Sequence, residues 1–125
     1  MSCVEVFEEV AVPQIESYRF GYLVVDGQEH HGDLIILPDR VLDGWWRKEG
    51  HALHPEDLGA VFEAKPDLLV VGQGASGLMV VARETILSLA EAGIELIAQP
   101  TDKACQTYKR LCEQRLVAAA LHLTC

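Results

Sequence analysis

The sequence of 125 residues lacks any apolar run close to the ~20 residues that a membrane-spanning helix needs. It also lacks a basic start. The first nine residues carry three acidic side chains and no Lys or Arg, which is unlike a secretory signal or an Arg-rich transit peptide. These absences predict a soluble, cytoplasmic protein with no membrane partner.

Basic residues are scarce, with 10 Lys and Arg against 19 Asp and Glu, and the formal net charge is −9. That charge repels phosphate backbones, so the sequence predicts no nucleic-acid partner. The four cysteines, Cys3, Cys105, Cys112 and Cys125, form no C-x-x-C pair, and reduced thiols are expected. Cys105 and Cys112 are predicted to be core thiols on one helix. Cys125 is the last residue, and no redox role is expected for it.

The composition is that of one globular domain, with 50% hydrophobic and 23% charged residues. A domain of this size buries roughly two thirds of its unfolded surface, so it needs no disulfide, metal or cofactor to fold. Residues 1–13 show little pattern and are predicted to be a loosely ordered arm. Residues 14–125 are predicted to form a single α/β domain.

The first half of that domain is predicted to be antiparallel β structure. Apolar and polar residues alternate from Ile15 to Val25, and Asp26-Gly27 is a hairpin signal because both residues tolerate positive φ. The return strand is predicted over about residues 28–37, with a short strand at residues 41–42. A helix is expected from Pro55, with Leu58, Val61 and Phe62 forming its apolar face.

The second half alternates apolar runs with helical patterns, in the order 68–71, 83–92, 94–98, a helix from Thr101, and 116–121. The runs are continuously apolar, which is typical of parallel strands covered on both faces. Ile86, Leu89 and Ala90 are predicted to be the apolar face of the first helix, and Thr101 the N-cap of the second. The predicted fold is a three-layer α/β domain with a mixed central sheet, a C-terminal βαβαβ unit and an N-terminal β-hairpin layer.

From Tyr22 to Cys125 the chain resembles a small α/β family of unknown biochemical function. That family includes the adipogenesis-associated domain protein and a mitochondrial complex I assembly factor. The residues that carry the resemblance are Trp46-Arg47, Pro66 to Gly74, Ala92-Gly93-Ile94, Thr101, Ala104, Tyr108, Leu111 and the ending His122-Leu123-Thr124-Cys125. The resemblance implies a mixed sheet preceded by a β-hairpin layer, and it brings no established catalytic residues.

Gly72-Gln73-Gly74-Ala75-Ser76-Gly77 has the G-x-G-x-x-G spacing of a dinucleotide site. In such a site a helix begins inside the motif, and an acidic residue closes the next strand. Here the motif is followed by extended Leu78 to Val81, and the next strand closes with Gln99-Pro100. A tight structural turn is the favoured interpretation, with a loop that cradles another ligand as the alternative.

Other candidate chemistry is weak. Ser76 does not stand in the G-x-S-x-G order of an esterase elbow, so a turn-forming serine is favoured. His51 and His54 lie in a loop without a nearby cysteine, and the adjacent His30 and His31 point to opposite faces of a strand, so no metal site is predicted. With no acid–base or nucleophile set, an enzyme is the least favoured class.

Two candidate sites follow. Trp45, Trp46 and Arg47 are a candidate interface, because Trp and Arg are frequent binding anchors, although one tryptophan could equally fill the core. The carboxyl ends of the three parallel strands should converge on a cleft for a small anion or polar metabolite. Its predicted residues are Gly72, Gly74, Ser76, Gly77, Arg83, Thr101 and His122. The competing interpretation is that the C-terminal tail fills this cleft.

The favoured function is a non-enzymatic protein-interaction or assembly module that uses the Trp45-Trp46 loop and a sheet edge. The sequence does not identify the protein partner, and a homodimer is one possibility. The alternative is a protein that binds a small anion or polar metabolite at the strand ends.

Overall fold

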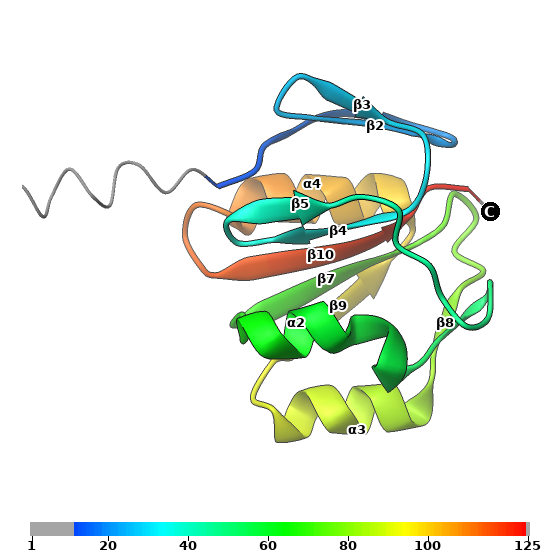
Figure 1. Ribbon diagram of the computed structural model, residues 1–125, viewed down its shortest axis with the longest axis vertical. Helices are drawn as coiled ribbons and strands as arrows, with labels where there is room; N and C mark the ends of the chain where they lie inside the picture. The colour runs from blue at the N-terminus through cyan, green and yellow to red at the C-terminus, as the bar shows by residue number, and fades with distance from the viewer. Residues whose placement is uncertain (1–11, 125) are drawn as a thin grey trace, which may run out of the picture.

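The computed structural model describes residues 12–124 and shows a mixed α/β fold (Figure 1). Its elements, in chain order, are β1 (Ile15–Arg19), β2 (Tyr22–Val25), β3 (Gln28–His30), β4 (Leu34–Leu37), β5 (Arg40–Leu42), β6 (Ala52–Leu53), the 3-10 helix η1 (Pro55–Leu58), α2 (Gly59–Ala64), β7 (Leu68–Gln73), β8 (Val80–Val81), α3 (Arg83–Glu91), β9 (Glu95–Gln99), α4 (Thr101–Leu111) and β10 (Val117–His122).

The central sheet has five strands in the order β5-β4-β10-β7-β9. β10, β7 and β9 are parallel, whereas β4 and β5 are antiparallel, so the predicted mixed sheet is confirmed. The chain passes from β7 outward to β9 on one side, then returns to β10 on the other. The strand order therefore reverses between β7 and β10, the kind of position where open α/β sheets place ligands.

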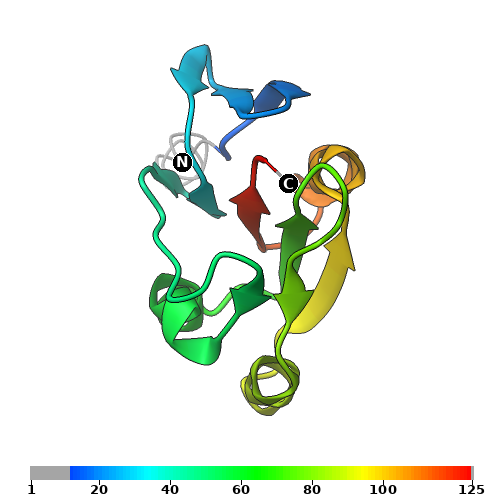
Figure 2. The same cartoon turned by 90° about the vertical axis from the view of Figure 1, so that its right-hand side faces the viewer.

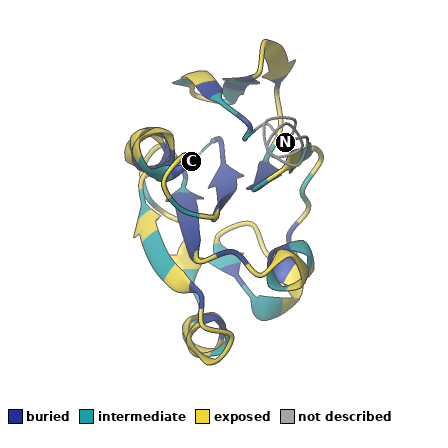
Figure 3. Cartoon of the chain, turned by 90° about the vertical axis from the view of Figure 1, so that its left-hand side faces the viewer, coloured by how far each residue is buried: buried dark blue, intermediate teal, exposed yellow. Residues whose placement is uncertain are grey.

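The inner strands β4, β7 and β10 are buried on both faces, as the continuous apolar runs of β7 and β10 predicted, whereas the edge strands β5 and β9 are partly exposed. In β7, Leu68 and Val70 join one core cluster, and the alternate residues Leu69 and Val71 join a second cluster. α4 and the β1–β3 layer cover the first face, and α2 and α3 cover the second (Figure 2). The darkest band in Figure 3 follows these central strands. The three-layer arrangement is thus a direct consequence of two apolar faces on one sheet.

The N-terminal β region differs from the prediction in two places. The strand expected from Ile15 to Val25 is interrupted by a turn at Gly21, whose φ is +72° and whose N–H donates to the Leu123 carbonyl at 2.8 Å. The return strand expected over residues 28–37 is split, because β3 stays in the three-stranded β1-β2-β3 sheet and β4 enters the central sheet. The Asp26-Gly27 hairpin is confirmed, with both residues at positive φ.

Two details of the helices α3 and α4 also differ from the prediction. Leu89 is buried in α3 as predicted, but Ile86 is 46% exposed and Ala90 is exposed, because α3 is an outer helix that contacts the domain through a narrow stripe. Thr85 is the other buried residue, and its hydroxyl donates to the Leu53 carbonyl at 2.7 Å. Thr101 was predicted to be the N-cap of α4, but it is the first helical residue and Pro100 is at the N-cap. The Thr101 hydroxyl instead forms hydrogen bonds with the Gly74 N–H and the His122 carbonyl.

The ends of the chain bear on two predictions. Most of the predicted arm, residues 1–11, lies outside the described residues, as does Cys125. Pro13, at the end of that arm, is buried, and its carbonyl accepts a hydrogen bond from the Tyr108 hydroxyl at 2.7 Å. Within residues 12–124, no helix is long and apolar enough to cross a membrane.

Candidate functional site

The carboxyl ends of the three parallel strands converge as predicted, and a chain of hydrogen bonds joins them. The Thr101 hydroxyl accepts from the Gly74 N–H at 2.9 Å and donates to the His122 carbonyl at 2.5 Å. The Thr101 N–H donates to the Gly74 carbonyl at 3.0 Å. Gly72, the residue before the last in β7, packs against Thr101. Four of the predicted residues, Gly72, Gly74, Thr101 and His122, therefore form one structural cluster.

Three backbone N–H groups of the glycine loop, those of Gly74, Ala75 and Gly77, donate hydrogen bonds within the protein. The Ala75 N–H donates to the Thr124 carbonyl at 2.6 Å, and the Gly77 N–H donates to the Gly74 carbonyl at 3.1 Å. A phosphate cradle needs such groups free and a helix that begins within the motif, but α3 begins only at Arg83. These contacts favour the structural turn and the interpretation in which the C-terminal tail fills the cleft.

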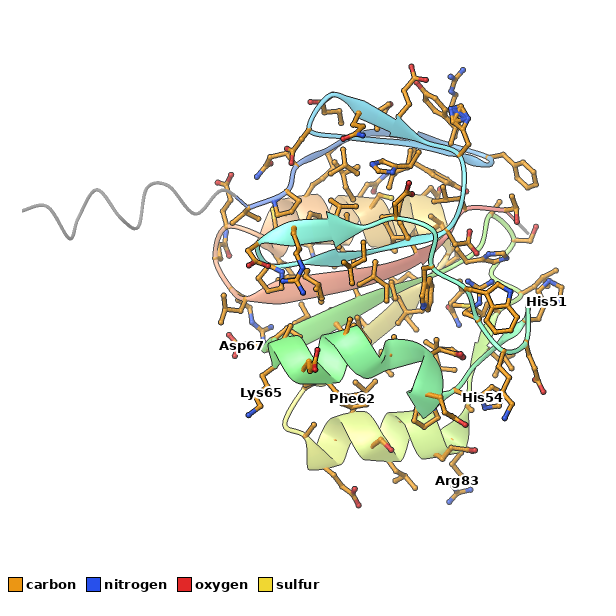
Figure 4. All side chains as sticks on the ribbon, viewed as in Figure 1. His51, His54, Phe62, Lys65, Asp67 and Arg83 are labelled. Carbon is orange, nitrogen blue, oxygen red and sulfur yellow. The ribbon has the colours of Figure 1, made fainter. Side chains whose placement is uncertain are left out.

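Two predicted residues lie apart from this cluster. Ser76 is exposed at the tip of the loop. Arg83 is exposed at the start of α3, and its side chain points away from the strand ends (Figure 4). Ser76 and Arg83 were predicted to line the cleft because they lie in or near the glycine loop in sequence. Their side chains do not lie at the strand ends.

Gly72 is required for close packing rather than for an unusual φ. A Cβ built on Gly72 would lie 2.9 Å from Leu121 Cδ2, 2.9 Å from Thr101 Oγ1 and 3.3 Å from Thr101 Cα. We expect Gly72→Ala to destabilise the fold by about 1–3 kcal/mol through overpacking. Urea unfolding compares it with Gly50→Ala, where the added Cβ meets nothing within 4 Å. Equal stability of the two variants would contradict this explanation.

Asp33, in the loop between β3 and β4, organises a second polar cluster beside these strand ends. Its Oδ2 accepts from Arg47 Nη1 at 2.7 Å and lies 2.8 Å from His122 Nδ1. Its Oδ1 accepts from the Leu123 N–H at 2.8 Å. One carboxylate thus ties the end of β10 to the segment that carries the tryptophans.

The ionised form of Asp33 is favoured by these contacts. Burial opposes ionisation, but the hydrogen bonds from the Leu123 N–H, Arg47 and His122 outweigh it, so the pKa of Asp33 lies below its ordinary value. The Arg47 guanidinium is itself buried and donates from Nη2 to the Gly50 carbonyl at 3.0 Å. Arg47, which was predicted to belong to an interface with the tryptophans, is therefore buried and bonded within the fold.

His122 Nδ1 contacts two side chains of this cluster. It lies 2.8 Å from Asp33 Oδ2, which can only accept, and 3.2 Å from Arg47 Nη2, which can only donate. The other ring nitrogen is Nε2. This Nε2 is buried and has no hydrogen-bond partner within residues 12–124, and the same is true of Arg47 Nε. The ring of His51, an exposed residue, lies edge-on with its centroid 6.3 Å from that of His122.

The two tryptophans have different roles. Trp45 is half-buried, its Nε1–H donates to the Asp57 carbonyl at 2.9 Å, and the Arg47 guanidinium lies 4.8 Å from its ring centroid. The side chain of Trp46 is on the surface, and the residue is 79% exposed. The structure thus agrees with one of the predicted possibilities, in which one tryptophan packs against the core and the other is available for contact.

His30, Cys105 and Cys112 are buried side chains of the fold. His30 is buried with Nδ1 3.1 Å from Asp43 Oδ1, whereas His31 is exposed, as expected of adjacent strand residues. In the described part of the chain, no three His, Cys, Asp or Glu side chains are arranged to hold a metal ion. Cys105 and Cys112 are buried free thiols, and burial raises the pKa of Cys105 to about 12.

Sequence reasoning missed Asp33 completely. It lies 14 residues from Arg47 and 89 from His122, so no local spacing joins the three. The only usable signal is that Asp33 stands directly before the apolar run Leu34 to Leu37, where polar residues at strand ends often enter sites.

A mixed five-stranded sheet between two helical layers, with a β meander at its start, defines a class of small α/β domains found in several solved structures. One is a conserved hypothetical protein from Pyrococcus horikoshii, with a TM-score of 0.77 and 28% identity over 90% of this chain and 99% of that chain. A protein from Rhodopseudomonas palustris is 33% identical, covers 86% of this chain and 81% of its own, and has a TM-score of 0.70. A protein described as an outer membrane protein from Bartonella henselae is 25% identical, with a TM-score of 0.78 over 92% of this chain and 98% of that chain.

Residues 15–122 match the family described as "Protein of unknown function (DUF498/DUF598)". The chain belongs to this family. The expected α/β family of unknown function is therefore confirmed, while the adipogenesis-associated domain protein and the complex I assembly factor stay predicted relatives.

Proposed function

We propose that the chain is a non-enzymatic docking or assembly module of the cytoplasm, with Trp46 as its anchor. The observation that carries the proposal is the contrast between the two tryptophans, since Trp45 is packed and Trp46 is 79% exposed. The next residue, Arg47, is fixed in the buried cluster with Asp33, so the backbone that presents Trp46 is held before binding. Such preorganisation lowers the entropic cost of association.

Apolar residues on the adjoining strand extend the surface around this loop. Leu78 and Val80 are exposed, and the Val80 N–H donates to the His51 carbonyl at 2.8 Å, so β8 runs beside the end of the tryptophan loop. The edges of the central sheet, β5 and β9, are further candidate contacts. An exposed tryptophan supported by exposed apolar residues would have the composition of a binding hot spot.

The binding partner that fits the surface around Trp46 is a different protein with an apolar pocket and a basic rim. The net charge of −9 makes two copies of this chain repel each other and attracts a positively charged surface. A homodimer is the competing outcome.

We expect Trp46→Ala to weaken binding of the partner about 30-fold or more, the loss typical of a hot-spot tryptophan. The partner is first identified by crosslinking from native lysate, then purified and measured against the full chain by calorimetry at two salt concentrations. Affinity should fall as salt rises, and folding stability of the variant should change by less than about 0.5 kcal/mol.

Phe20→Ala is the matched control, because Phe20 is also an exposed aromatic but lies in the β1–β2 turn. It should bind like the wild type. Two results would contradict the proposal. One is a partner that binds Trp46→Ala and wild type equally, and the other is concentration-dependent dimerisation in ultracentrifugation that Trp46→Ala abolishes.

The other two function classes have less support. The predicted anion cleft at Gly72 to Gly77 has its loop amides paired with backbone carbonyls. An enzyme remains the least supported class, because burial raises the pKa of both Cys105 and Cys112 and so disfavours their nucleophilic thiolates.

A further inference from the structure

We propose that the groove between β1 and α4 binds a small linear molecule with an ammonium group at one end and a carboxylate at the other. A cavity of about 150 Å³ lies there, and its lining comes from these two elements: Ile15, Ser17 and Tyr18 from β1, and Asp102, Cys105, Gln106 and Lys109 from α4. Drug-sized ligands occupy pockets of about 300–1,000 Å³, so a cavity of this size indicates a smaller metabolite.

The spacing of the residues on α4 explains how side chains of one helix face the same cavity. Asp102, Cys105, Gln106 and Lys109 stand at positions i, i+3, i+4 and i+7, which lie on one face of a helix. β1 packs beside α4 and provides the opposite wall (Figure 1). Ile15 and Cys105 are buried in the core cluster between the central sheet and α4. The groove therefore has an apolar base with polar groups above it.

Two opposite charges mark the ends of this groove. Asp102 is in the first turn of α4 and Lys109 in the last, about 10 Å apart along the axis at about 1.5 Å per residue. Both are exposed, and within residues 12–124 neither is in an ion pair. Burial mainly raises the pKa of the Cys105 thiol, but Lys109 lowers it and Asp102 raises it, so both charges act on the middle of the groove.

This arrangement of charges selects a long zwitterion. A ligand ammonium group pairs with Asp102 and a ligand carboxylate with Lys109, while the methylene chain between them covers the apolar base. An α-amino acid carries both charged groups on one carbon, so it reaches only one end of the groove. A linear ω-amino acid such as δ-aminovalerate separates its charges by several methylene groups and reaches both ends.

The test is a titration of the full chain followed by NMR of the backbone amides of β1 and α4. The probes are δ-aminovalerate, its single-charge analogues valerate and pentylamine, and glycine, a zwitterion too short to reach both ends. We expect δ-aminovalerate to shift the Ser17 and Gln106 amides saturably at roughly millimolar concentration. It should bind about fivefold more tightly than either analogue, the upper value of one exposed ion pair, and glycine should give no saturable shift.

Two variants assign the charges. Asp102→Asn should bind δ-aminovalerate no more tightly than it binds valerate, because the ligand ammonium group has lost its partner. Lys109→Gln should bind it no more tightly than it binds pentylamine, because the ligand carboxylate has lost its partner. Lys103→Gln, at a lysine of the same helix that does not line the cavity, should bind like the wild type. All three replaced side chains are exposed, so the variants should fold.

Two results overturn the proposal. If valerate or pentylamine binds the wild type as tightly as δ-aminovalerate, the charge pair does not select the ligand. If no probe gives a saturable shift, Asp102 and Lys109 serve only the ends of the helix dipole. Trp46→Ala should bind δ-aminovalerate like the wild type, because the neighbouring Trp45 packs against the core cluster on the other face of the sheet. Failure of the docking proposal therefore leaves this one standing.

Discussion

Asp33→Asn is expected to destabilise the fold by about 3–5 kcal/mol, the cost of removing one member of a buried ion pair. The substitution preserves the size of the side chain but leaves the buried Arg47 guanidinium without its counter-charge and places an N–H₂ donor among donors. Urea unfolding at neutral pH measures the change. Asp39→Asn is the control, because the Asp39–Arg40 pair is solvent-exposed, and we expect it to change stability by less than about 1 kcal/mol.

The pH dependence separates lost charge from lost packing. The pKa of Asp33 is below its ordinary value of 3.8 in the folded chain, so its ionised form stabilises the fold above pH 3.8. That contribution is lost as pH falls through the folded pKa, where the protonated carboxyl resembles an amide. The stability difference between wild type and Asp33→Asn should therefore shrink below about pH 4. A constant difference from neutral pH into this acid range would show that charge is not the cause.

Thr101→Val is expected to destabilise the fold by about 2–4 kcal/mol, although it preserves the shape of the side chain. The Thr101 hydroxyl pairs the Gly74 N–H and the His122 carbonyl, and both are left unpaired and buried when it is lost. Thermal and urea unfolding measure the loss. Thr101→Ser keeps the hydroxyl and should recover most of the stability, with a remaining cost from the missing methyl group.

Thr107→Val tests whether any threonine in α4 would behave similarly. Its hydroxyl donates to Gln99 Oε1 at 2.7 Å, a side chain that can turn to water when the partner is removed. We expect a loss below about 1.5 kcal/mol. If Thr107→Val and Thr101→Val lose equal stability, the hydrogen bonds of Thr101 between the strand ends are not the cause of its larger contribution.

The strand-end cluster was partly predictable. Gly72, Gly74, Thr101 and His122 stand at the carboxyl ends of apolar runs, and parallel strands bring such ends together. What the pattern did not show is that the groups satisfy one another. The difference matters for function, because amides paired with Thr101 and Thr124 have no capacity left for a phosphate.

The tryptophan pair was ambiguous for a physical reason. Trp45 and Trp46 are adjacent in an irregular loop, where no periodicity assigns one side chain to the core and the next to solvent. The core position of Trp45 is fixed by Asp57, whose carbonyl accepts a hydrogen bond from the indole N–H of Trp45. Asp57 belongs to η1, which begins ten residues after Trp45.

By itself the sequence determined the order and type of most elements, the parallel strands buried on both faces and the core thiols. These depend on local periodicity and on turn residues such as Asp26-Gly27, which act over a few residues. Only the tertiary structure decided that residues 15–37 divide between two sheets and that Asp33, Arg47 and His122 meet. Those outcomes depend on hydrogen bonds between distant segments, such as the Leu123 N–H with Asp33, 90 residues apart, and no local pattern encodes them.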